Sequence, residues 1–348
     1  MSRGKLSTAI DAAIDIVNRD PLGRASASTL GDAMWSAGQF EEGGRAYQLA
    51  VSNGWRDRSA QTWAIEAALA NKHLGQAAMH VDALLRVAPA TEIPAEWMLE
   101  IESNPKGRAV MAARLSRSPP WAAQWLRSLA EASASKVHKR IETVRLARAA
   151  GMRIERQVAR NVTWQMLQKH PGEAYNLWQA INQPEDHLGG EIWGSNLMRG
   201  ALLNSGGPFE WRKTDTTGVQ MIGGRRGRVP VLEIRGLTLS SAELAQTHLA
   251  LLPGTYRLLW NKSDPALLVD FRISCIGPDV NISAKNVSRS RSTSQLLQFK
   301  ISRGCILQKV GLTANGNVSG LSEGFISALR LENENNSTIS SDVRRVVR

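Results

Sequence analysis

The sequence contains two cysteines, Cys275 and Cys305, and both lie in segments whose alternating apolar residues predict β-strands. A disulfide between them would close a loop of about 30 residues and stabilise the folded chain by roughly 3 to 4 kcal/mol through loop entropy. Such a bond forms in an oxidising compartment such as the periplasm, whereas two free buried thiols fit a cytosolic protein. The residue types leave both interpretations open.

Arginine side chains supply a second kind of chemistry, the binding of anions. Arg225, Arg226 and Arg228 lie among three glycines in one short segment. Their guanidinium groups could bind phosphate or uronate oxygens through forked hydrogen bonds. An ordinary hairpin turn with solvated side chains is the alternative.

Positive charge is concentrated in two parts of the chain, whose net charge is +12. Residues 101–160 carry 13 basic and 4 acidic side chains, and residues 201–348 carry 19 and 11. Within the first part, Arg145, Arg148 and Arg156 have spacings compatible with one broad helical face. A basic surface of this kind binds nucleic acid, acidic polysaccharide or an anionic membrane, and a solvated helix face is the alternative.

No arrangement typical of an enzyme is found in the sequence. Two cysteines alone make no zinc site, and His73 with His80 on a predicted helix lack a third ligand. Neither a phosphate-binding glycine loop nor a serine elbow is present. Asp270 and Glu233 on predicted strands could form a carboxylate pair, although solvated strand faces carry such charges routinely. We therefore predict that the protein is not an enzyme and has no catalytic residue, no cofactor and no metal.

Length and composition indicate a globular protein of two domains. The chain has 348 residues, of which 43% are hydrophobic and 21% are charged. It has no apolar stretch long enough to span a membrane, so no transmembrane segment is predicted. Near the N-terminus, Asp11, Asp15 and Asp20 interrupt any run that could serve as the core of a signal peptide. Localisation therefore stays open: the periplasm or cell envelope if the cysteines are bridged, the cytoplasm if the given start is genuine.

The pattern of residues changes near position 200. Before it, apolar residues recur at spacings of three and four, which predicts helices, and after it they alternate, which predicts antiparallel strands. Turn residues at 203–208 mark the boundary. The predicted domains are a helical domain at 1–203, a β-sandwich domain at 204–332 and a disordered polar tail at 333–348.

A 34-residue repeat is present in the helical part. The first unit contains Leu30, Ala33, Met34, Gly38, Phe40, Gly43, Tyr47, Leu49 and Ala50, and the second contains Ala64, Ala67, Ala68, Lys72, Leu74, Ala77, Val81, Ala83 and Leu84. Each unit predicts a helix, a tight turn and a second helix, and the pattern resembles a tetratricopeptide repeat. It departs from that family at Gly43, where alanine is usual, and at Lys72, which replaces the turn glycine. Further helical pairs are predicted at 105–150 and 153–181.

The resemblance implies an α-helical solenoid, tetratricopeptide-like, whose concave surface binds a protein partner, and a rigid spacer without a partner is the alternative. Nine of the eleven tryptophans precede residue 200. We predict that they pack between helices, as Trp121 and Trp125 would from one helix face.

The second half predicts about eight strands, spaced as in a β-sandwich or jelly roll. The clearest hairpin joins 247–252 to 255–260 through Pro253 and Gly254. Short local sequences resemble jelly-roll modules of the carbohydrate-binding kind, among them Pro208 to Trp211, Leu252 to Arg257, and Arg272 to Cys275 with Gly304 and Cys305. The resemblance implies a bacterial protein that is associated with the cell envelope and with exopolysaccharide. Trp211 is the aromatic side chain that could stack on a sugar, and packing at the sandwich edge is the alternative.

The fold class predicted from sequence is therefore α+β in separate domains, a helical solenoid followed by an antiparallel sandwich. The favoured function is a noncatalytic scaffold. Its helical domain would bind a protein partner, and its basic sandwich would contact an acidic glycan or a second protein, in envelope polysaccharide synthesis or export. Nucleic-acid binding through the basic helical face is less expected because no recognition motif is present. An unrecognised glycan hydrolase is the third hypothesis.

Overall fold

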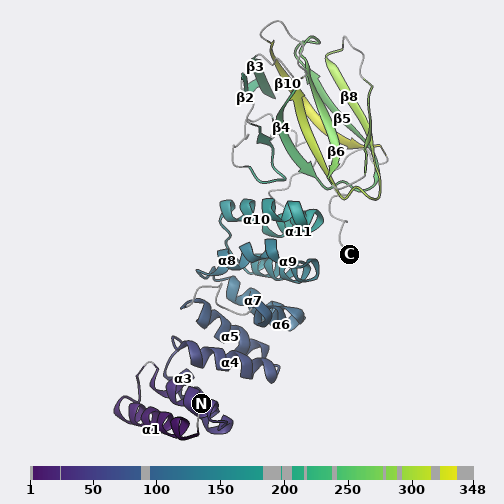
Figure 1. Cartoon of the computed structure of the whole chain (residues 1–348). Helices are drawn as coiled ribbons and strands as arrows, with labels where there is room; N and C mark the ends of the chain where they lie inside the picture. Colours follow the sequence, from purple (N-terminus) through teal and green to yellow (C-terminus); the bar gives the residue numbers. More distant parts are fainter. Residues whose placement is uncertain are drawn as a thin grey trace. The chain divides into compact units, whose positions relative to one another are not determined.

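The computed structural model describes residues 3–23, 25–87, 95–182, 197, 206–214, 218–236, 241–276, 280–287, 292–314 and 322–334. The chain divides into two compact units, a helical unit at Met1–Glu155 and a β unit at Arg156–Arg348. Helices come first and two antiparallel sheets follow, as Figure 1 shows, so the predicted combination of α and β structure is confirmed. The predicted boundary at 203–204 lies outside the described residues. The last two helices belong to the β unit by contact.

The described helices are α1 (Arg3–Arg19), α2 (Ser26–Ser36), α3 (Phe40–Asn53), α4 (Arg58–Ala70), α5 (Leu74–Leu85), α6 (Ala95–Ser103), α7 (Pro105–Leu115), α8 (Ala122–Arg127), α9 (Ala134–Ala149), α10 (Arg156–Lys169) and α11 (Pro171–Ile181). A short 3-10 helix, η2 (Ser128–Glu131), follows α8. The two predicted repeat units are the packed helix pairs α2 with α3 and α4 with α5. Within the helical unit, α3 packs on α4 and α5 on α7, so that consecutive pairs lie side by side (Figure 1).

The turns inside the two repeat units share one backbone conformation. Gly38 has φ +79° and Lys72, which lies 34 residues later, has φ +57°. Both angles fall in the left-handed region, which is costly for any residue with a Cβ atom. The repeat therefore persists in the backbone where the residue type departs from it.

Local signals set the other helix ends. The Asp57 side chain accepts a hydrogen bond from the Ala60 N–H at 3.1 Å and caps α4. Asn104 caps α7 in the same way through the Lys106 N–H at 2.8 Å, and Pro105 occupies the first helical position. Ser118, Pro119 and Pro120 lie between α7 and α8, where two consecutive prolines favour a break between helices.

A buried ion pair joins the later helices of the helical unit. Glu102 of α6 and Arg140 of α9 lie 3.0 Å apart with side chains 1% and 6% exposed. The Trp125 indole N–H donates to the other Glu102 oxygen at 3.1 Å, and Arg140 also donates to Ser128 at 2.7 Å. Breaking a pair of this kind would leave a buried charge without its partner, which is strongly destabilising. The network therefore fixes α6, α8 and α9 in one arrangement.

The strands of the β unit are β1 (Arg212–Lys213), β2 (Val219–Arg226), β3 (Val229–Gly236), β4 (Ala242–Leu249), β5 (Gly254–Lys262), β6 (Val269–Ile276), β7 (Ser283–Asn286), β8 (Ser294–Ile301), β9 (Leu307–Ala314) and β10 (Ser322–Asn333). They form a four-stranded sheet in the order β1-β4-β9-β6 and a six-stranded sheet in the order β2-β3-β10-β5-β8-β7. All pairs are antiparallel.

The two sheets share one hydrophobic core. Trp260, Phe299 and Phe271 are its large aromatic members, each at most 3% exposed. They come from β5, β8 and β6, hence from both sheets. Their alternation with polar residues along each strand was the signal that predicted the strands.

One predicted pairing is wrong. The strands on either side of Pro253 and Gly254 do not form a hairpin, because β4 pairs with β9 and β1 whereas β5 pairs with β10 and β8. The connection crosses from one sheet to the other. The predicted polar tail also begins later than expected, since β10 includes Asn333 and Glu334 forms an ion pair with Arg257 at 2.7 Å. Residues 335–348 lie outside the described residues.

The left-handed conformation of Lys72 leads to a stability prediction. The substitution Lys72→Gly should stabilise the helical unit by roughly 0.5–1 kcal/mol, because glycine adopts positive φ without a steric cost. Lys139→Gly, at an exposed position inside α9, should instead destabilise it by about 1 kcal/mol. Urea unfolding followed by far-UV circular dichroism measures both. Equal destabilisation by the two changes would contradict the left-handed turn.

Candidate functional site

A pocket of about 330 Å³ lies between α2, α3 and α4 of the helical unit. Its aromatic lining residues are Trp35, Tyr47 and Trp63, and its polar ones are Asp32, Arg58, Ser59, Thr62 and Glu66. Those from α4 recur at spacings of three and four, which places them on one face of the helix. Most of the lining therefore comes from α2 and α4, the first helices of the two repeat units.

Tyr47 of α3 forms the base of the pocket. Its side chain is 7% exposed, and its hydroxyl donates a hydrogen bond to Asp32 Oδ1 at 2.5 Å. The ring stacks on Trp63 with centroids 5.5 Å apart and meets the edge of Trp35 at 6.2 Å. Burial raises the pKa of the Tyr47 phenol, and the hydrogen bond to Asp32 raises it further. The hydroxyl is therefore a neutral donor that holds the Asp32 carboxylate in place.

Close approach of α2 and α3 makes this arrangement possible. A Cβ atom at Gly31 of α2 would lie 2.9 Å from Cδ1 of Tyr47, a distance that no side chain tolerates. Gly44 of α3 lies against Trp63, where an added Cβ would come within 3.4 Å of the indole. The absence of a side chain at Gly31 thus lets the Tyr47 ring lie against α2, whereas a Cβ atom at Gly44 would make only an ordinary van der Waals contact with Trp63.

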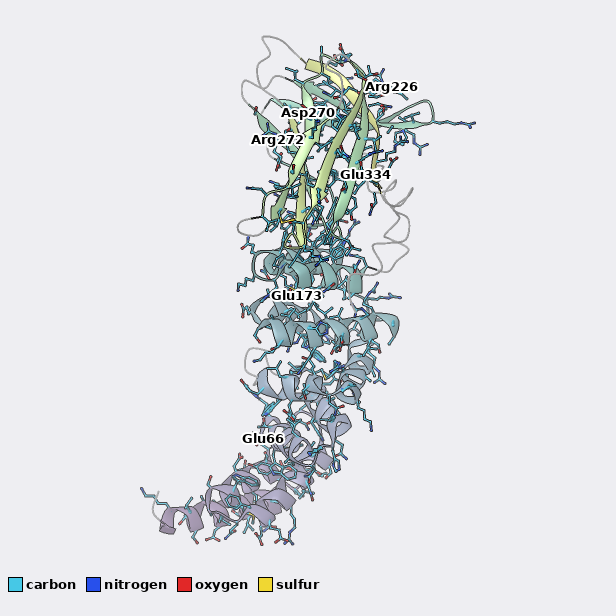
Figure 2. All side chains as sticks on the ribbon, turned by 90° about the vertical axis from the view of Figure 1, so that its right-hand side faces the viewer. Glu66, Glu173, Arg226, Asp270, Arg272 and Glu334 are labelled. Atoms are coloured by element: carbon cyan, nitrogen blue, oxygen red, sulfur yellow. A yellow bond between two sulfur atoms is a disulfide. The ribbon has the colours of Figure 1, made fainter. Side chains whose placement is uncertain are left out.

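Two aromatic residues at and beside the rim of the pocket are unusually exposed. Trp35 is 43% exposed, and Phe40, which lies beside the pocket and meets Trp35 edge-on at 5.0 Å, is 58% exposed. Together with the carboxylates of Asp32 and Glu66 and the guanidinium of Arg58, these rings form a surface suited to noncovalent contact. Glu66 is labelled on the helical unit in Figure 2. Exposed aromatic groups of this kind mark interaction sites more often than isolated apolar residues do.

The sequence assigned Trp35 to helix packing, whereas the structure leaves it at the rim. Trp121 and Trp125 do pack inside, each 4% exposed. The pocket itself was not predicted. The sequence features that could have predicted it are the glycines at 31 and 43–44, since glycine is unfavourable inside a helix, and the aromatic residues that lie near them at helical spacing.

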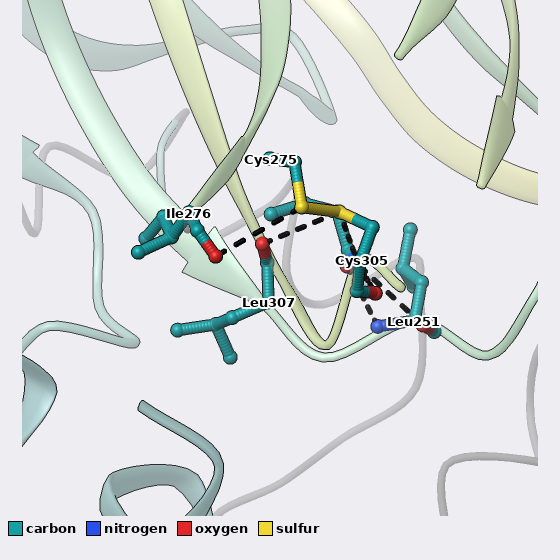
Figure 3. The surroundings of a disulfide bond; sticks show 6 residues. Leu251, Cys275, Ile276, Cys305 and Leu307 are labelled. Atoms are coloured by element: carbon teal, nitrogen blue, oxygen red, sulfur yellow. Dashed lines mark hydrogen bonds between the residues drawn. A yellow bond between two sulfur atoms is a disulfide. The ribbon is translucent and has the colours of Figure 1, made fainter. Parts of the chain in front are cut away.

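Cys275 and Cys305 are joined in a disulfide in the β unit, with their Cα atoms 5.6 Å apart (Figure 3). Cys275 is the second-last residue of β6, and Cys305 precedes β9. The buried Gln308 amide lies beside the bond, accepting from the Leu251 N–H at 2.8 Å and donating to the Cys305 carbonyl at 2.9 Å. The disulfide and this amide therefore tie the loops before β5 and β9 to the end of β6.

The predicted arginine loop is the β2–β3 hairpin. Gly227 has φ +64°, and residues 226 and 229 are paired, so the turn has two residues. Arg225 and Arg228 are exposed. Arg226, which is labelled in Figure 2, contacts the Phe325 ring at 4.4 Å and lies 3.5 Å from Glu233, and these contacts order it against the sheet. The structure thus presents two outward guanidinium groups and one that packs on its own sheet.

Trp211 does not lie on the surface. It is 3% exposed and packs edge-on against Phe271 at 6.1 Å, inside the core shared by the two sheets. This is the edge packing that was the alternative to a sugar contact. A residue that follows a turn can enter the core when the short strand after it pairs with β4, as β1 does here.

The three arginines predicted as one basic face do not act together. Arg145 is exposed on α9, but Arg148 of the same helix donates to the Met152 carbonyl at 2.5 Å. Arg156 begins α10 in the other unit and pairs with Glu210 at 2.7 Å. Helical spacing alone could not show this, because a helix boundary separates the last residue from the first two.

Asp270 and Glu233 are not a carboxylate pair. Asp270 lies on β6 of the four-stranded sheet and Glu233 on β3 of the six-stranded sheet. Each is engaged by a cation, Lys262 at 3.5 Å and Arg235 at 3.1 Å respectively. Over the part of the chain that the structure describes, no group of three histidine, cysteine or acidic side chains is placed to hold a metal ion.

No helix in the described ranges has the length and apolarity required to cross a bilayer. Comparison with protein-family models and with curated proteins finds no match to this chain.

The hydrogen bond at the base of the pocket leads to a stability prediction. Tyr47→Phe and Asp32→Ala should each destabilise the helical unit, and the double variant should lose less than their sum. We expect a coupling energy of about 1–2 kcal/mol, because the carboxylate makes this hydrogen bond stronger than a neutral one. Urea unfolding of the four proteins measures it. Strictly additive effects would show that the two groups do not interact.

Proposed function

We propose that this protein is a noncatalytic interaction protein. The helical unit binds a protein partner through the pocket between α2, α3 and α4, and the basic β unit contacts an acidic glycan or a second protein. The observation that carries the proposal is the pocket itself, where Trp35 is 43% exposed above a base ordered by Tyr47. Large exposed aromatic residues over an ordered base are typical of residues that dominate protein binding.

We also propose the finer fold assignments. A tetratricopeptide-like solenoid is supported by the 34-residue interval between the left-handed turns at Gly38 and Lys72. A jelly roll is supported by the strand order: β3-β10-β5-β8 in one sheet and β4-β9-β6 in the other, so that β3 to β6 alternate between sheets.

The disulfide favours an oxidising compartment, which agrees with a role at a bacterial cell envelope in polysaccharide synthesis or export. The alternatives have less support. Nucleic-acid binding by the basic helical face is less supported because Arg145, Arg148 and Arg156 do not form one face. A hydrolase is less supported because Asp270 and Glu233 lie on different sheets and are not a pair.

The pocket can be tested with a displayed library of random peptides panned on the full-length protein. Peptides that are enriched on the wild type should bind Trp35→Ala or Trp63→Ala at least tenfold more weakly, as expected for a central aromatic contact. Trp55→Ala is the matched control, since Trp55 is 46% exposed but lies outside the pocket. Fluorescence anisotropy of labelled peptides measures the affinities. The proposal is wrong if no peptide is enriched or if the three variants bind alike.

The β unit can be tested with polygalacturonate, a uronate polymer, as the probe. The double variant Arg225→Ala/Arg228→Ala should lose roughly tenfold in affinity, because these two exposed guanidinium groups are the ones free to face outward from the hairpin. Lys136→Ala/Lys139→Ala removes the same charge from α9 and should have little effect.

Binding is measured at two salt concentrations beside duplex DNA. Loss of DNA binding in the α9 variant would support the nucleic-acid alternative, whose affinity falls steeply with salt. If wild type retains neither polymer at low salt, the glycan contact is excluded and the peptide pocket stands alone.

A further inference from the structure

We infer that the pocket between α2, α3 and α4 receives an arginine side chain of the protein partner. The inference rests on the proposed function, since it names the chemistry of the partner that the pocket binds. It is carried by the way tryptophan rings and carboxylates are paired on the two helices.

Each of the two helices presents one tryptophan and one carboxylate on the same face. On α2, Asp32 precedes Trp35 by three residues, and on α4, Glu66 follows Trp63 by three. Residues three apart are neighbours on a helix surface. All four side chains line the same pocket. Two helices thus bring the same pair of groups to one opening, in opposite sequence order.

This combination is complementary to a cation. Indole is the strongest aromatic partner for a cation, and the pocket offers two indoles, Trp35, which is 43% exposed, and Trp63, which is partly buried and stacks on Tyr47. Carboxylates beside the rings supply the opposite charge. The surroundings act in the same direction, since residues 1–100 carry 12 acidic and 9 basic side chains.

Guanidinium fits better than ammonium. Its planar group stacks on indole and can donate forked hydrogen bonds to a carboxylate, whereas an ammonium group is a compact and strongly hydrated charge. Asp32 is oriented by the Tyr47 hydroxyl, so that one of the two acceptors is held before the ligand arrives. A preorganised acceptor lowers the cost of binding.

Arg58 provides the opposing charge and hence the sharpest test. It lines the pocket from the first turn of α4. Its positive charge disfavours a bound cation and favours a bound anion. Arg58→Ala should therefore strengthen the binding of a cationic segment and weaken that of an anionic one, which makes the sign of the change diagnostic.

The experiment uses four pools of short peptides that are randomised except for a central arginine, lysine, glutamine or glutamate. The arginine pool should be retained most strongly by the immobilised full-length protein. For its best member, Glu66→Gln should weaken binding about two- to fivefold and Arg58→Ala should strengthen it by a similar factor. Glu96→Gln, an exposed carboxylate on α6 outside the pocket, is the matched control. Affinities are measured by anisotropy at two salt concentrations, and higher salt should weaken binding.

The outcomes separate this inference from the proposed function. Preference for the glutamate pool, with weaker binding by Arg58→Ala, would overturn the inference. So would equal retention of all four pools, while continued dependence on Trp35 would leave the pocket as a peptide site. If the lysine and arginine pools are retained equally, the pocket binds a cationic side chain, but the inference that it prefers guanidinium to ammonium is wrong. If no pool binds the wild type, both the inference and the proposed function of the pocket fail.

Discussion

The close contact between α2 and α3 is the constraint on which the pocket depends. Tyr47 can lie flat against α2 only because Gly31 has no side chain, and its hydroxyl then reaches Asp32. With the phenol in this position, Trp63 stacks on its ring from α4 while Trp35 borders it from α2. A larger residue at position 31 would displace the ring and remove the base of the pocket, so the geometry of the site follows from one helix crossing.

The two units use their aromatic residues differently, which explains why one offers an aromatic surface and the other a basic one. In the β unit, Trp211, Trp260 and Tyr256 are each at most 3% exposed, because a core between two sheets takes the inward residue of every strand. The surface of this unit instead carries the exposed arginines of the β2–β3 hairpin. A stack of helical pairs buries each helix against neighbours on only part of its circumference. The faces of α2 and α4 therefore keep Trp35 at the surface.

Sequence patterns could predict the helical pairs and the strands, because each of these depends on periodicity or on residue type, whereas they left open whether Cys275 and Cys305 are bridged. Lys72 shows that a repeat can even be followed through a substitution, since the turn keeps its left-handed backbone. The sequence could not predict which residues from separate elements become neighbours in the fold. Whether Trp35 is buried depends on which helices lie over it, and whether Arg148 faces outward depends on the path of the chain at Met152. The false hairpin at Pro253 arose for the same reason, because sequence adjacency does not say which sheet the next strand joins.

The change from helices to strands is not where the chain divides into units, because α10 and α11 contact the segment after them and β4 at several points, among them the ion pairs of Glu210. Burial would raise the pKa of Glu210, but the Gly207 N–H bond at 2.7 Å and the charges of Arg156 and Arg160 outweigh it and lower the pKa. Glu210 thereby fastens α10 to the segment that leads into the sheets, and Trp178 of α11 packs so closely on Gly207 that an added Cβ would lie 2.6 Å from its ring. Arg156 therefore does not serve the predicted basic face, because it pairs with Glu210 and helps to hold α10 and α11 to the sheets of the same unit.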